Sequence, residues 1–113
     1  MTENCVFCKI VRGEIPVKLI YQNDDFIAFR DANPQAPIHV LVVPKRHSET
    51  ILEMKDAHEL GQAMLAVQEI AKLLNLQDEG FRLVVNTLEN GGQTVPHTHL
   101  HLLGGRFMQW PPG

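Results

Sequence analysis

The segment HTHLHLL, residues 97–103, places a histidine at every second position from 97 to 101. Successive side chains of a β-strand point to opposite faces, so this alternation predicts a strand with His97, His99 and His101 on one face. The opposite face presents leucines, which are suited to a hydrophobic core. Three imidazoles on one face are a costly arrangement unless they serve as ligands, bases or nucleophiles. The segment therefore predicts a strand that carries a functional site.

The alternation by itself leaves two functions open, catalysis and metal binding. A solvated edge strand is the plain alternative, and it explains a single histidine well. It explains three in strict alternation less well, because they follow the turn sequence NGGQ at residues 90–93. We therefore take residues 97–101 as a functional site.

Outward from this segment, short strands alternate with turns around one long helix. Apolar residues recur at helical spacing, and Asp56 is placed to cap the helix that they predict; they are Leu60, Met64, Val67, Ile70, Ala71 and Leu74. We expect a short N-terminal helix over 6–12, strands over 19–22, 26–30, 39–43, 81–86 and 97–103, a binding loop over 31–37, and a long helix over about 54–74. This order predicts an α+β fold on a five-stranded antiparallel sheet.

Length and composition restrict the class of protein. A chain of 113 residues forms one domain with a thin core, and such chains often gain stability from a metal or from a second copy. The formal charge of -3 argues against nucleic acid as the partner. No segment is apolar for long enough to cross a membrane, and the start MTEN has no basic, apolar leader. We expect a cytoplasmic protein with reduced cysteines.

Several motifs, in order, resemble the histidine triad (HIT) superfamily. The pattern His-x-His-x-His with apolar residues between and after is that family's signature. The segments APIHVLVVPK (36–45) and GGQTVPH (91–97) look like its first half-site and its phosphate loop. The ending LGGRFMQWPPG (103–113) resembles the Hint branch, the histidine triad nucleotide-binding proteins. The resemblance covers nearly the whole chain and implies a single HIT domain over 1–113.

The resemblance implies a hydrolase that cleaves the P–N bond of purine nucleoside phosphoramidates, or acyl-adenylates, and releases the nucleoside monophosphate. His99 matches the nucleophile, which carries the nucleotidyl group transiently. His39 and His101 match histidines that contact the phosphate and donate to its oxygens. Thr94 stands where Hint proteins have a serine near the leaving group. It keeps the hydroxyl and adds a methyl group.

The same resemblance places the nucleotide. Gly92, Gln93 and Thr94 match the phosphate pocket, where successive amides can form an anion nest, and Asn86 matches an asparagine that contacts the site. Asp31 is expected to accept hydrogen bonds from the ribose hydroxyls. An apolar patch is expected under the nucleoside, although each of its members is equally suited to the core; the patch comprises Val6, Phe7, Ile10, Phe29 and Leu41.

Cys5-x-x-Cys8 is a common way to present two thiolates to zinc. With His47 and His97 it makes an S2N2 set, which suits a structural zinc ion and resembles the arrangement in some bacterial HIT proteins. Two free thiols or a redox pair are the alternatives, and the redox reading lacks the strand-to-helix context that it requires. If His97 binds metal, catalysis rests on His39, His99 and His101.

The resemblance also implies a homodimer that pairs through the helix and a strand, with one sheet continuous across both copies and Trp110 near the partner's site. Three other functions stay open. These are a nucleotide-binding regulatory protein with little catalysis, a zinc-stabilised scaffold, and a dinucleoside polyphosphate hydrolase of the Fhit branch. The ending WPPG favours the Hint branch over Fhit, and His101 argues against nucleotidyl transferases, which usually have glutamine there.

Overall fold

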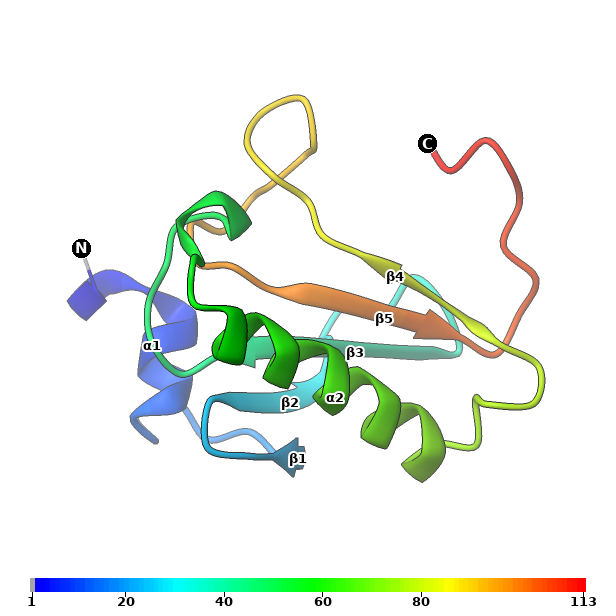
Figure 1. Ribbon diagram of the computed structural model, residues 1–113, viewed down its shortest axis with the longest axis horizontal. Helices are drawn as coiled ribbons and strands as arrows, with labels where there is room; N and C mark the ends of the chain where they lie inside the picture. The colour runs from blue at the N-terminus through cyan, green and yellow to red at the C-terminus, as the bar shows by residue number, and fades with distance from the viewer. Residues whose placement is uncertain (1) are drawn as a thin grey trace.

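The computed structural model describes residues 2–113 and contains one five-stranded antiparallel sheet in the order β1-β2-β3-β5-β4 (Figure 1). This architecture confirms the α+β class. The strands are β1 (Leu19–Gln22), β2 (Phe26–Arg30), β3 (Ile38–Pro44), β4 (Phe81–Val84) and β5 (Leu100–Gly104). The helices are α1 (Val6–Val11) and α2 (Ala57–Leu73), with short 3-10 turns η1 (Thr2–Asn4) and η2 (Ile51–Glu53).

The central strand β3 organises the sheet. Its β-branched residues suit a pleated, buried surface, and all of its residues except Ile38 are buried. It pairs with β2 on one side and with β5 on the other, where Leu41 lies opposite His101 and His39 opposite Leu103. The histidine-bearing strand is therefore an interior strand, and its His101 lies beside His39 of β3.

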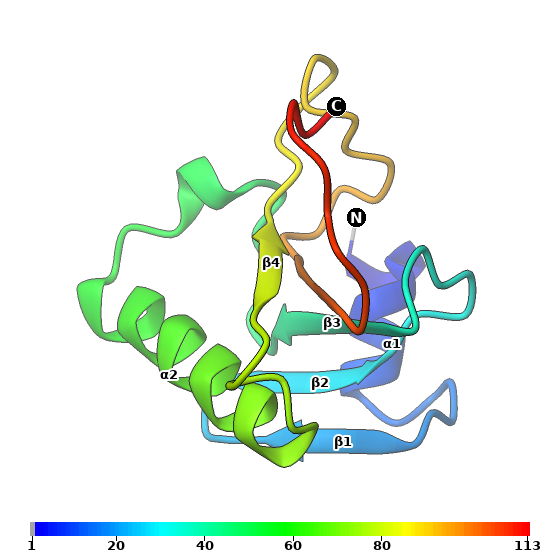
Figure 2. The same cartoon turned by 90° about the vertical axis from the view of Figure 1, so that its right-hand side faces the viewer.

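The two faces of the sheet are covered differently. Helix α2 lies across one face, and α1 lies on the other (Figures 1 and 2). The larger core fills the space under α2 and includes Val40, Val42, Leu100 and Leu102. A smaller cluster lies under α1 and includes Phe7, Phe29, Leu41 and both cysteines. Because side chains alternate, Leu100 and Leu102 face the α2 core as expected, which leaves His101 for the α1 side.

Two predicted elements start later than expected. Helix α2 begins at Ala57 rather than near residue 54, because Asp56 caps it by accepting a hydrogen bond from the His58 N–H at 2.9 Å. Strand β5 begins at Leu100 rather than at residue 97. The Thr98 N–H donates to the Ser48 carbonyl at 2.7 Å, and the two hydroxyls lie 2.7 Å apart. This contact diverts residues 97–99 from the sheet toward the loop after β3.

The outer face of α2 is partly apolar. Met64, expected in the core, is 43% exposed, whereas the small residues Ala63 and Ala66 are buried and let the helix approach the sheet closely. Leu65 and Leu73 are also exposed. None of the helices within residues 2–113 has the length and apolar character needed to cross a bilayer.

Candidate active site

His99 is held in one protonation form. Its Nδ1 lies 2.7 Å from the carbonyl oxygen of His97, and a carbonyl can only accept, so Nδ1 carries the proton. The lone pair is therefore on Nε2. The ring of Phe7 packs edge-on against this imidazole, with centroids 5.0 Å apart. A buried imidazole with a fixed tautomer and a free Nε2 is suited to nucleophilic attack or to proton abstraction.

His39 and His101 form a second, directed pair. The Gln35 N–H donates to Nδ1 of His39 at 3.0 Å, so neutral His39 carries its proton on Nε2. That Nε2 lies 2.9 Å from Nδ1 of His101 and donates to it. His101 consequently carries its own proton on Nε2. Both nitrogens of His39 are engaged within the protein, so in this geometry His39 orients His101, and the phosphate contact that the resemblance implies for His39 stays a prediction.

Burial, aided by the neighbouring His99 and His39, lowers the pKa of His101 to about 4. Burial also lowers the pKa of His97 to about 4. Both rings are therefore neutral at pH 7. A neutral His101 keeps one N–H donor, on Nε2, and keeps Nδ1 as the acceptor for His39.

Acid is expected to destabilise the fold through His101. Because its pKa in the fold lies below the ordinary value of 6.5, the unfolded chain binds the proton first as the pH falls. The stability contributed by the neutral ring is complete above 6.5 and is lost between 6.5 and about 4. The shift corresponds to about 3 kcal/mol, which solvent screening of this half-buried ring reduces to about 2 kcal/mol. Urea midpoints of the native chain and of His101→Gln, measured across this window, check the expectation. The native chain should lose more stability than the variant, and parallel losses would contradict it.

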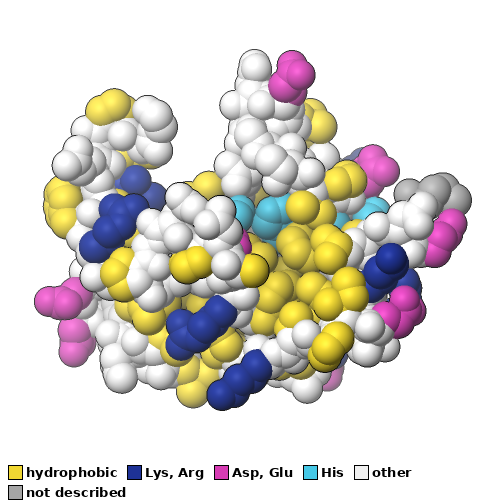
Figure 3. Space-filling view, turned by 180° about the vertical axis from the view of Figure 1, so that it is seen from behind, with side chains coloured by type: hydrophobic (Ala, Val, Ile, Leu, Met, Phe, Trp, Pro, Cys, Tyr) yellow, Lys and Arg dark blue, Asp and Glu magenta, His cyan; other side chains and the backbone are white. Residues whose placement is uncertain are grey.

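A cleft of about 660 Å³ lies in front of these histidines. Figure 3 shows histidine side chains along the border of a broad apolar surface on this face of the molecule. The volume suits a ligand of nucleotide size. Four of the five patch residues predicted from the sequence line the cleft, which are Phe7, Ile10, Phe29 and Leu41. Val6 is the exception, because it faces a separate cavity beside Cys5.

Asp31 stands at the polar end of the cleft. Its Oδ1 accepts a hydrogen bond from the Asn33 N–H at 2.8 Å, and its Oδ2 lies 3.4 Å from Nε2 of His39. The side chain is 21% exposed, so its remaining lone pairs face the cleft. A carboxylate held in this way is suited to accept from hydroxyl groups of a ligand.

Close contacts and hydrogen bonds within its own backbone determine the shape of the loop before β5. A Cβ at Gly91 would lie 2.4 Å from the Thr87 carbonyl oxygen, so this approach requires glycine. Gly92 has a φ of +75°, which also favours glycine. Its N–H donates to Glu89, and the Asn86 side-chain amide donates to the Gly91 carbonyl at 2.6 Å. Asn86 and Gly92 thus shape the loop and do not line the cleft.

Gln93 also helps to shape this loop. Its Nε2 donates to the carbonyls of Glu49 at 2.6 Å and Val95 at 3.0 Å, and its Oε1 accepts from the Leu88 N–H. Its backbone N–H also donates to Leu88. Because these amides point inward, they do not form the expected anion nest. Of the predicted loop residues, Thr94 alone lines the cleft.

Cys5, Cys8, His47 and His97 converge on one point, with all four ligand atoms within 4.8 Å of one another. Nδ1 of His97 lies 3.2 Å from the Cys5 sulfur, 3.5 Å from the Cys8 sulfur and 3.0 Å from Nδ1 of His47. Nδ1 of His47 lies 3.3 Å from the Cys8 sulfur. The predicted S2N2 set is thus assembled from α1, the loop after β3 and the segment before β5.

The chemistry of this set fits a tetrahedral cation. Bonds of about 2.1 Å to nitrogen and about 2.3 Å to sulfur imply N···N edges of about 3.3 Å and N···S edges of about 3.6 Å. The observed N···N and N···S distances between the four ligand atoms are only slightly shorter. Nε2 of His97 lies 3.0 Å from the Pro44 carbonyl oxygen and donates to it, so its Nδ1 is unprotonated and available as a ligand. Burial, aided by Cys5, raises the pKa of the Cys8 thiol to about 11, so ion binding must displace its proton.

Asp31, His39 and His101 make a second cluster of potential ligands. Here the hydrogen bonds oppose a cation. The Gln35 N–H occupies Nδ1 of His39, so the proton must stay on Nε2, which is the atom that faces the other two residues. A metal bound at Nε2 of His39 would have to displace this proton and break the hydrogen bond from His39 to His101. The cluster fits a hydrogen-bonded relay, and the S2N2 set fits a metal centre.

Six residues that line the cleft were not predicted from the sequence. Three of these residues lie in the loop 31–37, whose position between two strands marked it for binding without indicating which side chains face inward. The others carried no motif. The missed residues are Val17, Arg30, Ala32, Asn33, Gln35 and Val95.

Comparisons with known proteins agree with this site. A family model described as the HIT domain matches residues 12–108. The chain is 50% identical to a HIT-like protein of Synechococcus elongatus, with all of both chains covered. It is 44% identical to the purine nucleoside phosphoramidase of Escherichia coli, over 94% of this chain and 91% of that protein. The crystal structure of a HIT family hydrolase from Legionella pneumophila superposes with a TM-score of 0.93 at 46% identity, and covers 97% of this chain and 100% of that one.

Proposed function

Since the chain belongs to the HIT family, we propose that it hydrolyses the P–N bond of purine nucleoside phosphoramidates, with acyl-adenylates as related substrates. The observation that carries the proposal is His99, whose proton is held on Nδ1 and whose Nε2 is free on a ring that lines the cleft. The similarity to a protein named purine nucleoside phosphoramidase supports this substrate class.

In the proposed first step, Nε2 of His99 attacks the phosphorus and the P–N bond to the amine breaks. The departing nitrogen takes a proton, which we assign to the Thr94 hydroxyl, and Thr94 regains its proton from the attacking water in the second step. His99 becomes positively charged, and its Nδ1–H bond to the His97 carbonyl stabilises that charge. His101 donates from Nε2 to a non-bridging oxygen, and His39 fixes the direction of this donor.

In the second step, water attacks the phosphorus and the P–Nε2 bond breaks. The water gives up a proton, which balances the one that left with the amine, and the nucleoside monophosphate departs. His99 returns to its neutral form. Covalent catalysis of this kind replaces one difficult displacement by two easier ones. The nucleoside is proposed to lie on the apolar wall of the cleft, with its ribose hydroxyls donating to Asp31.

We also propose that zinc binds the S2N2 set. Zinc favours four tetrahedral ligands of sulfur and nitrogen, and a set of four protein ligands leaves no open position for water. Its contribution there would be structural, because it would join α1 to the loop after β3 and to the segment before β5. Neither Cys5 nor Cys8 forms a disulfide, so we propose a cytoplasmic location, where thiols stay reduced.

A second copy of the chain is the partner that we propose for the outer face of α2 and the edge strand β4. Met64, Leu65 and Leu73 are exposed on the helix, and Phe81 is 41% exposed on the strand. Pairing of two copies would cover these groups and the unpaired sheet edge. Sedimentation should therefore give twice the 12.7 kDa of one chain. A mass of 12.7 kDa at all concentrations would contradict the dimer.

The test of the proposed reaction is release of amine from adenosine 5′-phosphoramidate. The native chain should yield equal amounts of amine and nucleoside monophosphate. His58→Ala is the matched control, because this histidine is 74% exposed on α2 and lies outside the cleft, so its activity should equal that of the native chain. A native chain that binds the monophosphate and releases no amine would leave only the binding-protein function.

A further inference from the structure

We infer that a metal ion at Cys5, Cys8, His47 and His97 positions the catalytic His99, in addition to stabilising the fold. The inference rests on the proposed function. Two separate chains of contact connect the metal set to the His99 imidazole, one through the backbone and one through helix α1. Both pass through segments that carry the ligands and lie outside the sheet, the residues before β5 and helix α1.

The first connection is the His97 carbonyl, which fixes the tautomer of His99 at 2.7 Å. His97 precedes β5, so its backbone is held outside the antiparallel ladder, by the Thr98 N–H that donates to the Ser48 carbonyl at 2.7 Å, and Ser48 adjoins the ligand His47. Its side chain is fully buried, with Nε2 on the Pro44 carbonyl and Nδ1 in the metal set. A metal bond to Nδ1 therefore anchors the residue whose carbonyl orients the nucleophile.

The second connection is Phe7. Its ring contacts His99 at 5.0 Å and His97 at 5.7 Å between centroids, and it lines the nucleotide cleft. Helix α1 has only six residues, too few to be stable by itself. Cys5 caps this helix and Cys8 lies within it, on either side of Phe7. Metal bonds to both sulfurs would hold the helix, and with it Phe7, against the imidazole.

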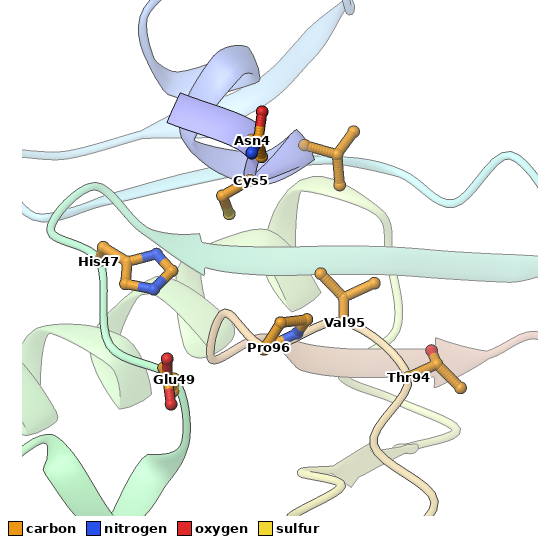
Figure 4. Close-up of a pocket in the computed structure, with 8 residues that line it drawn as sticks. Asn4, Cys5, His47, Glu49, Thr94, Val95 and Pro96 are labelled. Carbon is orange, nitrogen blue, oxygen red and sulfur yellow. The ribbon is translucent and has the colours of Figure 1, made fainter. Parts of the chain in front are cut away.

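A second cavity of about 310 Å³ gives an ion access to the set. Cys5 and His47 line it, together with Glu49 at its rim and with Thr94, Val95 and Pro96 (Figure 4). Thr94 and Val95 also line the nucleotide cleft, so one short segment separates the two spaces. Two of the four ligands, Cys5 and His47, are thus reachable from this cavity.

Removal of the ion should affect His99 in a way that a simple loss of fold stability would not. The larger core under α2 contains none of the four ligands, so the sheet and α2 should stay folded when the ion is removed. His99 should then lose its single tautomer, because the ion no longer anchors His97 or the loop of His47 and Ser48 to which the His97–Thr98 peptide is bonded. Misplacement of a reacting group by about 1 Å lowers turnover by about a hundredfold, and we expect a loss of this size.

The experiment compares the zinc-loaded protein with the chelated and the reconstituted protein. Nitrogen-15 NMR of the imidazoles reports the His99 tautomer, and circular dichroism reports the fold. We expect a single Nδ1–H form in the loaded protein, a mixture after chelation with the fold retained, and recovery on reloading. The turnover number with adenosine 5′-phosphoramidate should fall and recover in parallel.

Two substitutions at His47 isolate the metal, because this residue contacts neither the His99 ring nor the cleft. His47→Cys retains four ligands and should keep the tautomer and the turnover, whereas His47→Gln should behave like the chelated protein. Phe7→Leu retains the ligands and should keep the zinc content, but it removes the ring that packs on His99 and lines the cleft, so it should lower kcat as well as raise KM. Zinc-loaded His58→Gln should match the native chain.

Two outcomes would overturn the inference. In one, the chelated, folded protein keeps the single Nδ1–H tautomer. In the other, chelation unfolds the whole chain, since the ion then acts on the fold and not on His99 in particular. A native protein without turnover would contradict the proposed function alone, because the tautomer measurement needs no substrate.

Discussion

Replacement of His99 by alanine is expected to lower amine release from adenosine 5′-phosphoramidate by about ten-thousandfold or more. The substitution removes the Nε2 lone pair that we propose as the nucleophile, and no other imidazole has the same position. His101 carries its proton on Nε2, and both nitrogens of His39 are engaged. Nucleoside monophosphate binding should change little, because the apolar wall and Asp31 stay in place.

Rapid-quench assays with mass spectrometry provide the decisive measurement. The native protein should accumulate a species heavier by one nucleotidyl group, and His99→Ala should not. Circular dichroism must show that the variant is folded, since the ring is buried. Equal turnover of His99→Ala and the native chain would exclude His99 as the nucleophile and favour direct attack by water.

Replacement of both thiols, Cys5→Ser with Cys8→Ser, is expected to abolish tight zinc binding and to lower the stability measured with zinc present. If free zinc exceeds the dissociation constant a thousandfold, the ion contributes about 4 kcal/mol to the free energy of unfolding. Serine is close to cysteine in size, so the loss reports the metal more than the packing. The two serines also remove the buried thiol whose raised pKa opposes ionisation without a cation.

Elemental analysis and urea unfolding check this expectation. The native protein should contain one zinc per chain, and a chelator should lower its unfolding midpoint to that of the double variant. The same chelator should leave the double variant unchanged, which is the internal control. A native protein that contains no zinc and does not respond to chelation would show that Cys5 and Cys8 are ordinary buried thiols.

Local pattern was a good guide where one residue type had one role. The β-branched run of β3 and the leucines at 100 and 102 predicted buried strand faces, and both are buried. Asp56 was recognised as a cap from its place before an apolar helical repeat, and it caps α2. These features depend on neighbours within a few residues, and such neighbours can be read directly from the sequence.

The sequence pattern was a poorer guide where groups distant in the sequence determine the hydrogen bonds and the packing. The histidine alternation predicted a strand from residue 97, yet Ser48 captures Thr98 and ends the ladder at Leu100. Gly92 and Gln93 suggested part of an anion nest, yet their N–H groups donate to the carbonyls of Glu89 and Leu88. Met64 matched the apolar repeat, but the sheet accepts only small side chains beside it. Each difference depends on a partner that no local spacing can identify.

The sequence by itself determined the fold class, the family resemblance, and which residue types supply the proposed nucleophile and the candidate metal ligands. Only the tertiary structure decided which atoms are free to act. It placed the protons of His99, His39 and His101 through the carbonyl of His97 and the N–H of Gln35. It also separated a set that fits a metal from one that does not. The physical reason is that a tautomer depends on hydrogen-bond partners, and these come from segments that only folding brings together.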